Sequence, residues 1–267
     1  MLQLLRIDLK KMTSYRTFWV VCGLYFMTLG FGAASGMEFL KWLASFIDGF
    51  GQQINIARIP LYHFPDVWLN LIWCAGLLKV IPAVMVVISI TNEYTYRTLR
   101  QNIIDGLSRG EFLLSKILTN VLLSLMSMTM IFVIGLVTGM IYSPSLEWSR
   151  IVTDLEFLPA YFLEVFFFLS YALMLGIIIQ RSGLTIILLL LSQLIEFIIT
   201  SNLDDYLPGM IPFFPMASIR DLITFPFPRY AFSEIRDYIS PAAAAVVLAW
   251  TFVFNYISYR KLKRSDI

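Results

Sequence analysis

Three ionisable residues lie inside long apolar runs of this sequence, where a charge is costly. They are Lys79, Glu164 and Glu196. Within hydrocarbon such groups usually face a bundle interior or a wet cavity. At a helical rise of about 1.5 Å per residue, Lys79 and Glu164 lie within ~5 Å of the same depth. They therefore form either a buried structural ion pair or part of a pathway that contacts cargo, whereas Glu196 lies near the outer end of its run and can reach the interface.

A second group of polar residues forms the segment Asn92–Lys116, between two apolar runs. Basic and acidic residues alternate there with aromatic and aliphatic ones, and the composition is compatible with helix. A loop that only connects two membrane helices does not need such content. We therefore expect a cytoplasmic partner protein to bind this segment. The alternative is a solvated loop that only sets the topology.

Few other residues could carry chemistry. The sequence has no GxxxxGK[ST] loop to hold phosphates. It has one histidine and two cysteines, too few for a zinc site. The run GLSRG at 106–110 has the spacing of a nucleophile elbow, but an elbow needs a preceding strand and a triad histidine. We therefore expect no catalytic residue, no metal site and no cofactor in this chain.

The elements that position these residues must be membrane helices. The chain has 267 residues, of which 58% are hydrophobic and 14% charged, and its mean hydropathy is +0.76. Soluble domains carry about 25% charged residues. The composition predicts an all-α polytopic membrane protein with a single transmembrane domain, residues 1–267. Runs long enough to cross about 30 Å of hydrocarbon predict six spans, at 18–37, 69–91, 117–141, 157–179, 184–200 and 241–258.

Basic residues near the span ends predict the orientation. Thirteen of the twenty Lys and Arg residues lie on the side of the two termini and of segment 92–116, and six lie on the opposite side. Both termini are therefore predicted to be cytoplasmic. The long outer segment 201–240 contains five prolines, which forbid one continuous helix. It should pack on the spans, because irregular backbone at membrane depth must be covered by protein.

Residues 1–14 are predicted to form an amphipathic helix that lies in the membrane interface. Leu2, Leu5, Leu9 and Met12 share one face at helical spacing, and lysines lie away from it. Such a helix rests among lipid headgroups. The alternative is an ordinary basic flank of the first span.

With these elements in place, segment 92–116 resembles the cytoplasmic segment of permease subunits in the type-2 ATP-binding-cassette exporter family. Those subunits show an acidic residue after the second span, a Thr-Arg or Arg-Thr pair, a Pro or Gly, then Ser-Arg and a Lys that opens the third span. The matching positions here are Glu93, Arg97, Thr98, Gly106, Ser108, Arg109 and Lys116. The family usually has a glycine before the threonine, where this chain has Arg97, and a proline where it has Gly106. The plan of an elbow helix and six spans also fits.

The resemblance implies a mechanism and partners. Two permease subunits, identical or related, would form the pathway, and two cytoplasmic ATPase subunits would bind ATP and magnesium. Segment 92–116 would supply a coupling helix held in a cleft of each ATPase, with Tyr94, Tyr96, Leu99 and Ile103 buried there. The residues expected to couple are Glu93, Tyr94, Tyr96, Arg97, Thr98, Arg100, Asp105, Gly106, Ser108, Arg109 and Lys116.

Two functions of other classes stay open at this stage. One is an ATP-independent channel or carrier that uses Lys79 and Glu164. The other is a membrane scaffold that transports nothing. In each case we expect a multi-pass protein of the cell membrane, in a bacterial cytoplasmic (inner) membrane, with lipids and not nucleic acid around it. The sequence carries no signature of a particular cargo.

Overall fold

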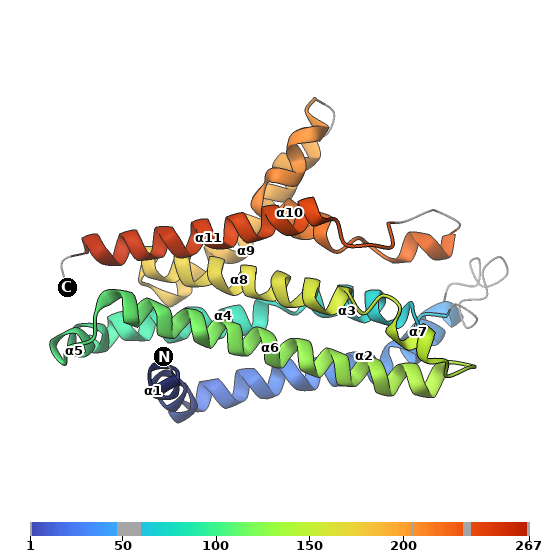
Figure 1. Cartoon of the computed structure of the whole chain (residues 1–267), viewed down its shortest axis with the longest axis horizontal. Helices are drawn as coiled ribbons and strands as arrows, with labels where there is room; N and C mark the ends of the chain where they lie inside the picture. The colour runs from blue at the N-terminus through green and yellow to red at the C-terminus, as the bar shows by residue number, and fades with distance from the viewer. Residues whose placement is uncertain (1, 47–59, 204–205, 232–235, 266–267) are drawn as a thin grey trace.

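The computed structural model describes residues 2–46, 60–203, 206–231 and 236–265, and within these ranges it is helical without a strand. Four long helices run roughly along the long axis of a bundle (Figure 1). They are α2 (Arg16–Phe46), α6 (Arg109–Tyr142), α8 (Phe157–Ile179) and α11 (Pro241–Arg264).

Helix α8 forms the centre of the bundle. Apart from Glu164 it is mostly apolar around its circumference, which is typical of a helix surrounded by others, and Phe167, Phe168 and Leu169 are fully buried. It packs against α11, α6 and α4 (Val80–Thr95). Gly176 permits the close approach of α4, because a Cβ there would lie 2.4 Å from the Ile90 side chain.

Four helices of the described chain are long and apolar enough to cross a membrane. They are α6, α8 together with the short α7 (Trp148–Val152), α9 (Ser182–Leu203) and α11. A fifth crossing is present if α3 (Val67–Leu77) and α4 act as one bent span. The predicted first span, 18–37, is helical as part of α2. Six crossings and cytoplasmic termini stay predictions.

The predicted second span, 69–91, is not one straight helix. The helix breaks at Leu78 and Lys79, and α3 and α4 meet there at an angle of 40°. Pro82 supplies a physical reason. In an uninterrupted helix its ring would clash with the carbonyl of residue 78 and it could donate no hydrogen bond, whereas in the first turn of a new helix it is tolerated.

Helix α1 (Leu2–Ser14) is seen nearly end-on in Figure 1, lying across the long helices. The predicted helix at 1–14 is present, and its place in the membrane interface stays a prediction. The short helix α5 (Thr98–Ile104) and the C-terminal end of α11 lie toward the same end of the bundle. We call this the α5 end.

The proline-rich segment 201–240 is broken into short pieces in its described part. After α9 come a 3-10 turn η2 (Pro208–Phe213), helix α10 (Pro215–Leu222) and a second 3-10 turn η3 (Phe227–Ala231). Proline begins η2 and α10, where a missing N–H costs nothing. Helix α10 packs against α11 and buries Met216, Ile219 and Leu222.

The predicted orientation can be tested with single cysteines in a chain that lacks Cys22 and Cys74. Gln101 on α5 and Ser149 on α7 are both exposed. We expect an impermeant maleimide to label Ser149→Cys from outside intact cells, and Gln101→Cys only after permeabilisation. Labelling of Gln101→Cys from outside would contradict the orientation.

Candidate functional site

Helix α5 has defined ends. It begins after Arg97, whose φ of 56° lies in the left-handed region, and this is the position where the resembling permeases carry glycine. It ends in a Schellman motif. The N–H of Gly106 donates to the Ile103 carbonyl at 3.1 Å, and the N–H of Leu107 donates to the Asn102 carbonyl at 3.0 Å. Gly106 has a φ of 97°, which disfavours any residue with a side chain.

One face of α5 is anchored on the bundle. Leu99 is 2% exposed, and Ile103 and Tyr94 pack against the same core. Leu99 is therefore not available to a partner, contrary to expectation, whereas Tyr94 and Ile103 are only partly buried. A helix of seven residues is unstable alone, so its apolar side chains are needed to fix it to its own chain.

The opposite face of α5 is free. Tyr96 is 64% exposed and Ile104 is 69% exposed. Their exposed neighbours on this side are Arg97, Arg100 and Gln101. We call these five residues the α5 outer face. Ile104 was missed at the sequence level, although positions 97, 100, 101 and 104 show the i, i+3, i+4, i+7 spacing of one helix face.

Beneath α5 lies a buried polar cluster centred on Lys116 of α6. The Lys116 ammonium is 2.5 Å from Asp8 Oδ1 of α1 and 3.2 Å from Glu93 Oε1 of α4. All three side chains are at most 7% exposed. A buried charge requires such partners, since an unpaired one is strongly destabilising.

Further contacts extend the cluster to α5. Thr119 donates to Asp8 Oδ2 at 2.6 Å, and Thr98 donates to the Glu93 carboxylate. Lys11 of α1 donates to Asn102 Oδ1 at 3.2 Å and lies 3.6 Å from Glu93 Oε1. We call this set the Lys116 network. It joins α1, α4, α5 and α6 through the residues Asp8, Lys11, Glu93, Thr98, Asn102, Lys116 and Thr119.

The network changes the roles expected for three residues of the resemblance. Glu93, Thr98 and Lys116 form internal contacts and do not line a partner surface. Asp8, Asn102 and Thr119 were not singled out from the sequence. Asp8 carries a usable signal, because it is the one acidic residue in a basic amphipathic helix.

Ser108 and Arg109 organise the start of α6. Ser108 and Glu111 form a reciprocal capping box, a pattern that S-x-x-E in the sequence indicates. Arg109 Nη1 donates to the carbonyls of Leu262 at 2.9 Å and Lys263 at 2.7 Å, at the C-terminal end of α11. Segment 92–116 is therefore not one coupling element, because α6 already begins at Arg109 and α5 covers only seven residues.

A polar cavity of about 450 Å³ lies between α5 and the helices α1, α4 and α6. Asp8, Lys11 and Glu93 line one side, and Asn102 and Asp105 of the α5 region line another. No group of three metal-ligating side chains is found in the part of the chain that the structure describes. The cavity therefore leaves empty space beside α5, on the side that faces α1 and α6.

The structure brings Lys79 and Glu164 together at the break between α3 and α4. Lys79 Nζ lies 2.6 Å from Glu164 Oε1, and the two side chains are 15% and 7% exposed. The ammonium also lies 5.5 Å from the centroid of the Phe168 ring, within cation–π range. Gly76 makes room for the carboxylate, because a Cβ at this position would come 2.8 Å from Glu164 Oε1.

A family model described as a protein of unknown function (DUF2705) matches residues 46–267. The chain belongs to this family. The match includes α5, Lys116 and the Lys79–Glu164 pair, whereas α1, with Asp8 and Lys11, precedes the matched residues. No curated protein matches the chain.

Glu196 has a separate role in this DUF2705 protein. Its Oε1 accepts hydrogen bonds from the backbone N–H groups of Met216 at 2.6 Å and Ala217 at 2.8 Å. These are free donors in the first turn of α10. Glu196 therefore fixes α10 to α9 and is not part of the Lys79–Glu164 pair.

The end of the bundle opposite α5 is held by a second polar cluster. Arg229 contacts both Asp66 and Asp237. Asn70 donates to the Tyr230 hydroxyl at 2.7 Å, and burial raises the pKa of Tyr230 to about 12. The hydroxyl therefore stays protonated at neutral pH and holds η3 against α3.

Proposed function

We propose that this chain is the membrane-spanning permease subunit of an ATP-binding-cassette transporter, of the type-2 exporter kind. It works as a dimer with an identical or related permease, and separate cytoplasmic ATPase subunits bind ATP and magnesium. The observation that supports this most is α5, a short capped helix at the end of the bundle where the C-terminus lies, with one face anchored and the other free.

The chemistry of the α5 outer face suits a compact protein partner. Tyr and Arg are enriched among the residues that dominate interface energies. Tyr96 and Ile104 offer apolar anchors, while Arg97 and Arg100 can pair with carboxylates in a cleft. The cleft would be acidic, because no carboxylate of this chain pairs with either arginine among the described contacts.

The Lys116 network gives this contact a mechanical consequence. A push on α5 acts on Asn102 and Thr98, which bind Lys11 and Glu93. Glu93 is held by Lys116 of α6. Displacement of α5 therefore moves the ends of α4 and α6 together with α1, which is what coupling of ATP-driven closure to membrane helices requires.

The alternative of a carrier that uses Lys79 and Glu164 as its site receives less support. The two groups satisfy each other at 2.6 Å, and both are largely buried. An ion pair whose two groups satisfy each other, at the break between α3 and α4, is explained by its structural role alone.

The coupling proposal predicts a loss of ATPase binding when the α5 outer face is changed. In the double variant Arg100→Glu/Ile104→Glu, charge is reversed and an apolar anchor is removed. We expect at least a tenfold weaker association, about 1.4 kcal/mol, with an ATP-binding-cassette ATPase that co-purifies with the unchanged chain. Co-purification from detergent and the ATPase turnover of the complex measure it.

The matched control is Lys263→Glu, an exposed charge reversal on α11 at the same end of the bundle. It should leave association unchanged. Equal binding by the double variant would contradict a docking role for α5. If the unchanged chain binds no such ATPase, the proposed function is wrong.

A further inference from the structure

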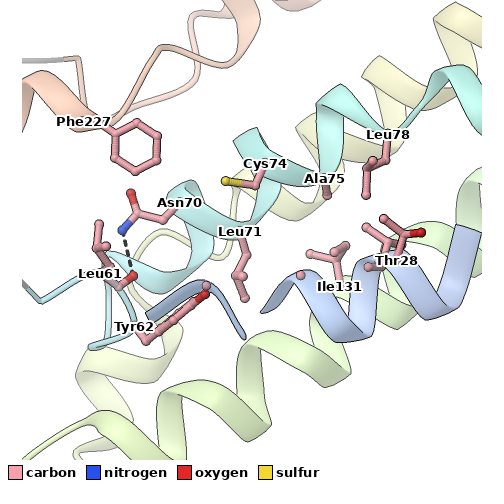
Figure 2. Close-up of a pocket in the computed structure, with 13 residues that line it drawn as sticks. Thr28, Leu61, Tyr62, Asn70, Leu71, Cys74, Ala75, Leu78, Ile131 and Phe227 are labelled. Carbon is pink, nitrogen blue, oxygen red and sulfur yellow. Dashed lines mark hydrogen bonds between the residues drawn. The ribbon is translucent and has the colours of Figure 1, made fainter. Parts of the chain in front are cut away.

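An apolar cavity of about 240 Å³ lies between α2, α3, α6 and η3 (Figure 2). It is larger than the cavities of about 150 Å³ that bind benzene inside proteins. None of the described residues that line it is charged. The residues that characterise its walls are Thr28, Gly32, Asn70, Cys74, Ile131 and Phe227.

The cavity lies beside helices that are apolar enough to cross a membrane, α6 and the bent pair α3 and α4, and it has a rim open to the surroundings. Its α3 wall belongs to the bent pair of helices that can serve as one span. Cys74 and Gly32, on opposite walls, are both exposed. A molecule dissolved in the hydrocarbon can therefore enter from the side, without passing through water.

The amide of Asn70 is one of the polar groups that distinguish the cavity from the surrounding lipid, together with the hydroxyls of Thr28 and Tyr62. Asn70 is 5% exposed, and its amide nitrogen donates to the Leu61 carbonyl at 2.8 Å and to the Tyr230 hydroxyl at 2.7 Å. These bonds fix the orientation of the amide. Its Oδ1 accepts no hydrogen bond from any described residue and points toward Phe227 in Figure 2.

The Tyr62 hydroxyl also lines the cavity and makes no hydrogen bond with Asn70 among the described contacts. The hydroxyl of Thr28 offers no competing donor. Thr28 donates to the Leu24 carbonyl within its own helix at 2.7 Å. A carbonyl oxygen without a donor is costly in an apolar medium. A guest that brings one N–H or O–H group removes that cost, whereas burial of a plain hydrocarbon gains little, because lipid tails are already apolar.

We infer that this cavity is a binding site for a neutral amphiphile from the membrane, with an apolar chain and one hydroxyl or amide donor for Asn70 Oδ1. The inference goes beyond the proposed function and does not depend on it, since binding needs only the purified chain.

Two glycines of α2 provide a matched test. A Cβ at Gly32 would meet nothing within 4 Å, and the residue lines the cavity, so we expect the side chain of Gly32→Leu to extend into the cavity. Gly30 also has free space and does not line the cavity. Gly30→Leu therefore adds the same side chain to the same helix elsewhere.

The probe is a diazirine-bearing octanol, photoactivated with the full chain in lipid nanodiscs, and mass spectrometry locates the labels. We expect labels on the residues of α2, α3 and α6 that line the cavity, at least fivefold fewer in Gly32→Leu, and no change in Gly30→Leu. Thermal unfolding of both variants checks that they fold. Equal labelling of the two variants, or labels spread over all lipid-facing helices, would overturn the site.

A second measurement uses the unchanged chain and tests the hydrogen bond. Excess 1-octanol should reduce the labelling at least threefold more than octane at the same concentration in the membrane. Equal competition by the two molecules would overturn the role of Asn70.

Discussion

Lys79→Met alone is expected to destabilise the folded chain by about 3–5 kcal/mol, the usual cost of removing one partner from a buried ion pair. Glu164 would stay behind with its carboxylate 7% exposed and no other cation within 4 Å among the described residues. Glu164→Gln should be damaging for the same reason, because it leaves the Lys79 ammonium unpaired. Thermal unfolding in detergent at one fixed scan rate measures both effects.

The double variant separates pairing from other causes. Lys79→Met/Glu164→Gln leaves no orphan charge, so it should recover most of the loss, with a coupling energy well above the 0.3–0.5 kcal/mol scatter of independent sites. Losses that simply add would show that the two groups do not stabilise each other. Full stability of each single variant with loss of transport would instead favour contact with cargo.

The position of this pair shows what could be predicted from the sequence. The helical rise sets the depth of each residue, and matched depths predicted that Lys79 and Glu164 could meet. The break between α3 and α4 was not predicted, although Pro82 signals it. Whether a proline bends a helix or begins a new one depends on packing, and at this break Glu164 of α8 packs closely against Gly76 of α3.

The α5 region shows what could not be predicted from the sequence. Its polarity and turn residues predicted an ordered segment between two membrane helices. Its composition could not tell which apolar residues face inward, because α5 is only seven residues long. Ion pairs between residues about a hundred positions apart, such as Asp8 and Lys116, depend on how α1 crosses α6. No local pattern encodes that crossing.

Lys116→Met is expected to damage both stability and the attachment of α5. It leaves two buried carboxylates, Asp8 and Glu93, with only the partly exposed Lys11 nearby, 3.6 Å from Glu93. The loss should reach at least the 3–5 kcal/mol of a broken buried pair. Amide hydrogen exchange should also become faster in α1 and α5, because the network that ties them to α6 loses its centre.

Lys261→Met is the matched control, since this exposed lysine lies on α11 at the same end of the bundle. It should change neither thermal unfolding nor exchange in α5. Adding Asp8→Asn and Glu93→Gln to Lys116→Met removes the orphan charges and should restore part of the stability, but not the slow exchange of α5, because neutral groups make weaker bonds than charged ones. If Lys116→Met leaves α5 exchange unchanged, the network is not what holds that helix, and the route proposed for coupling between α5 and the membrane helices is wrong.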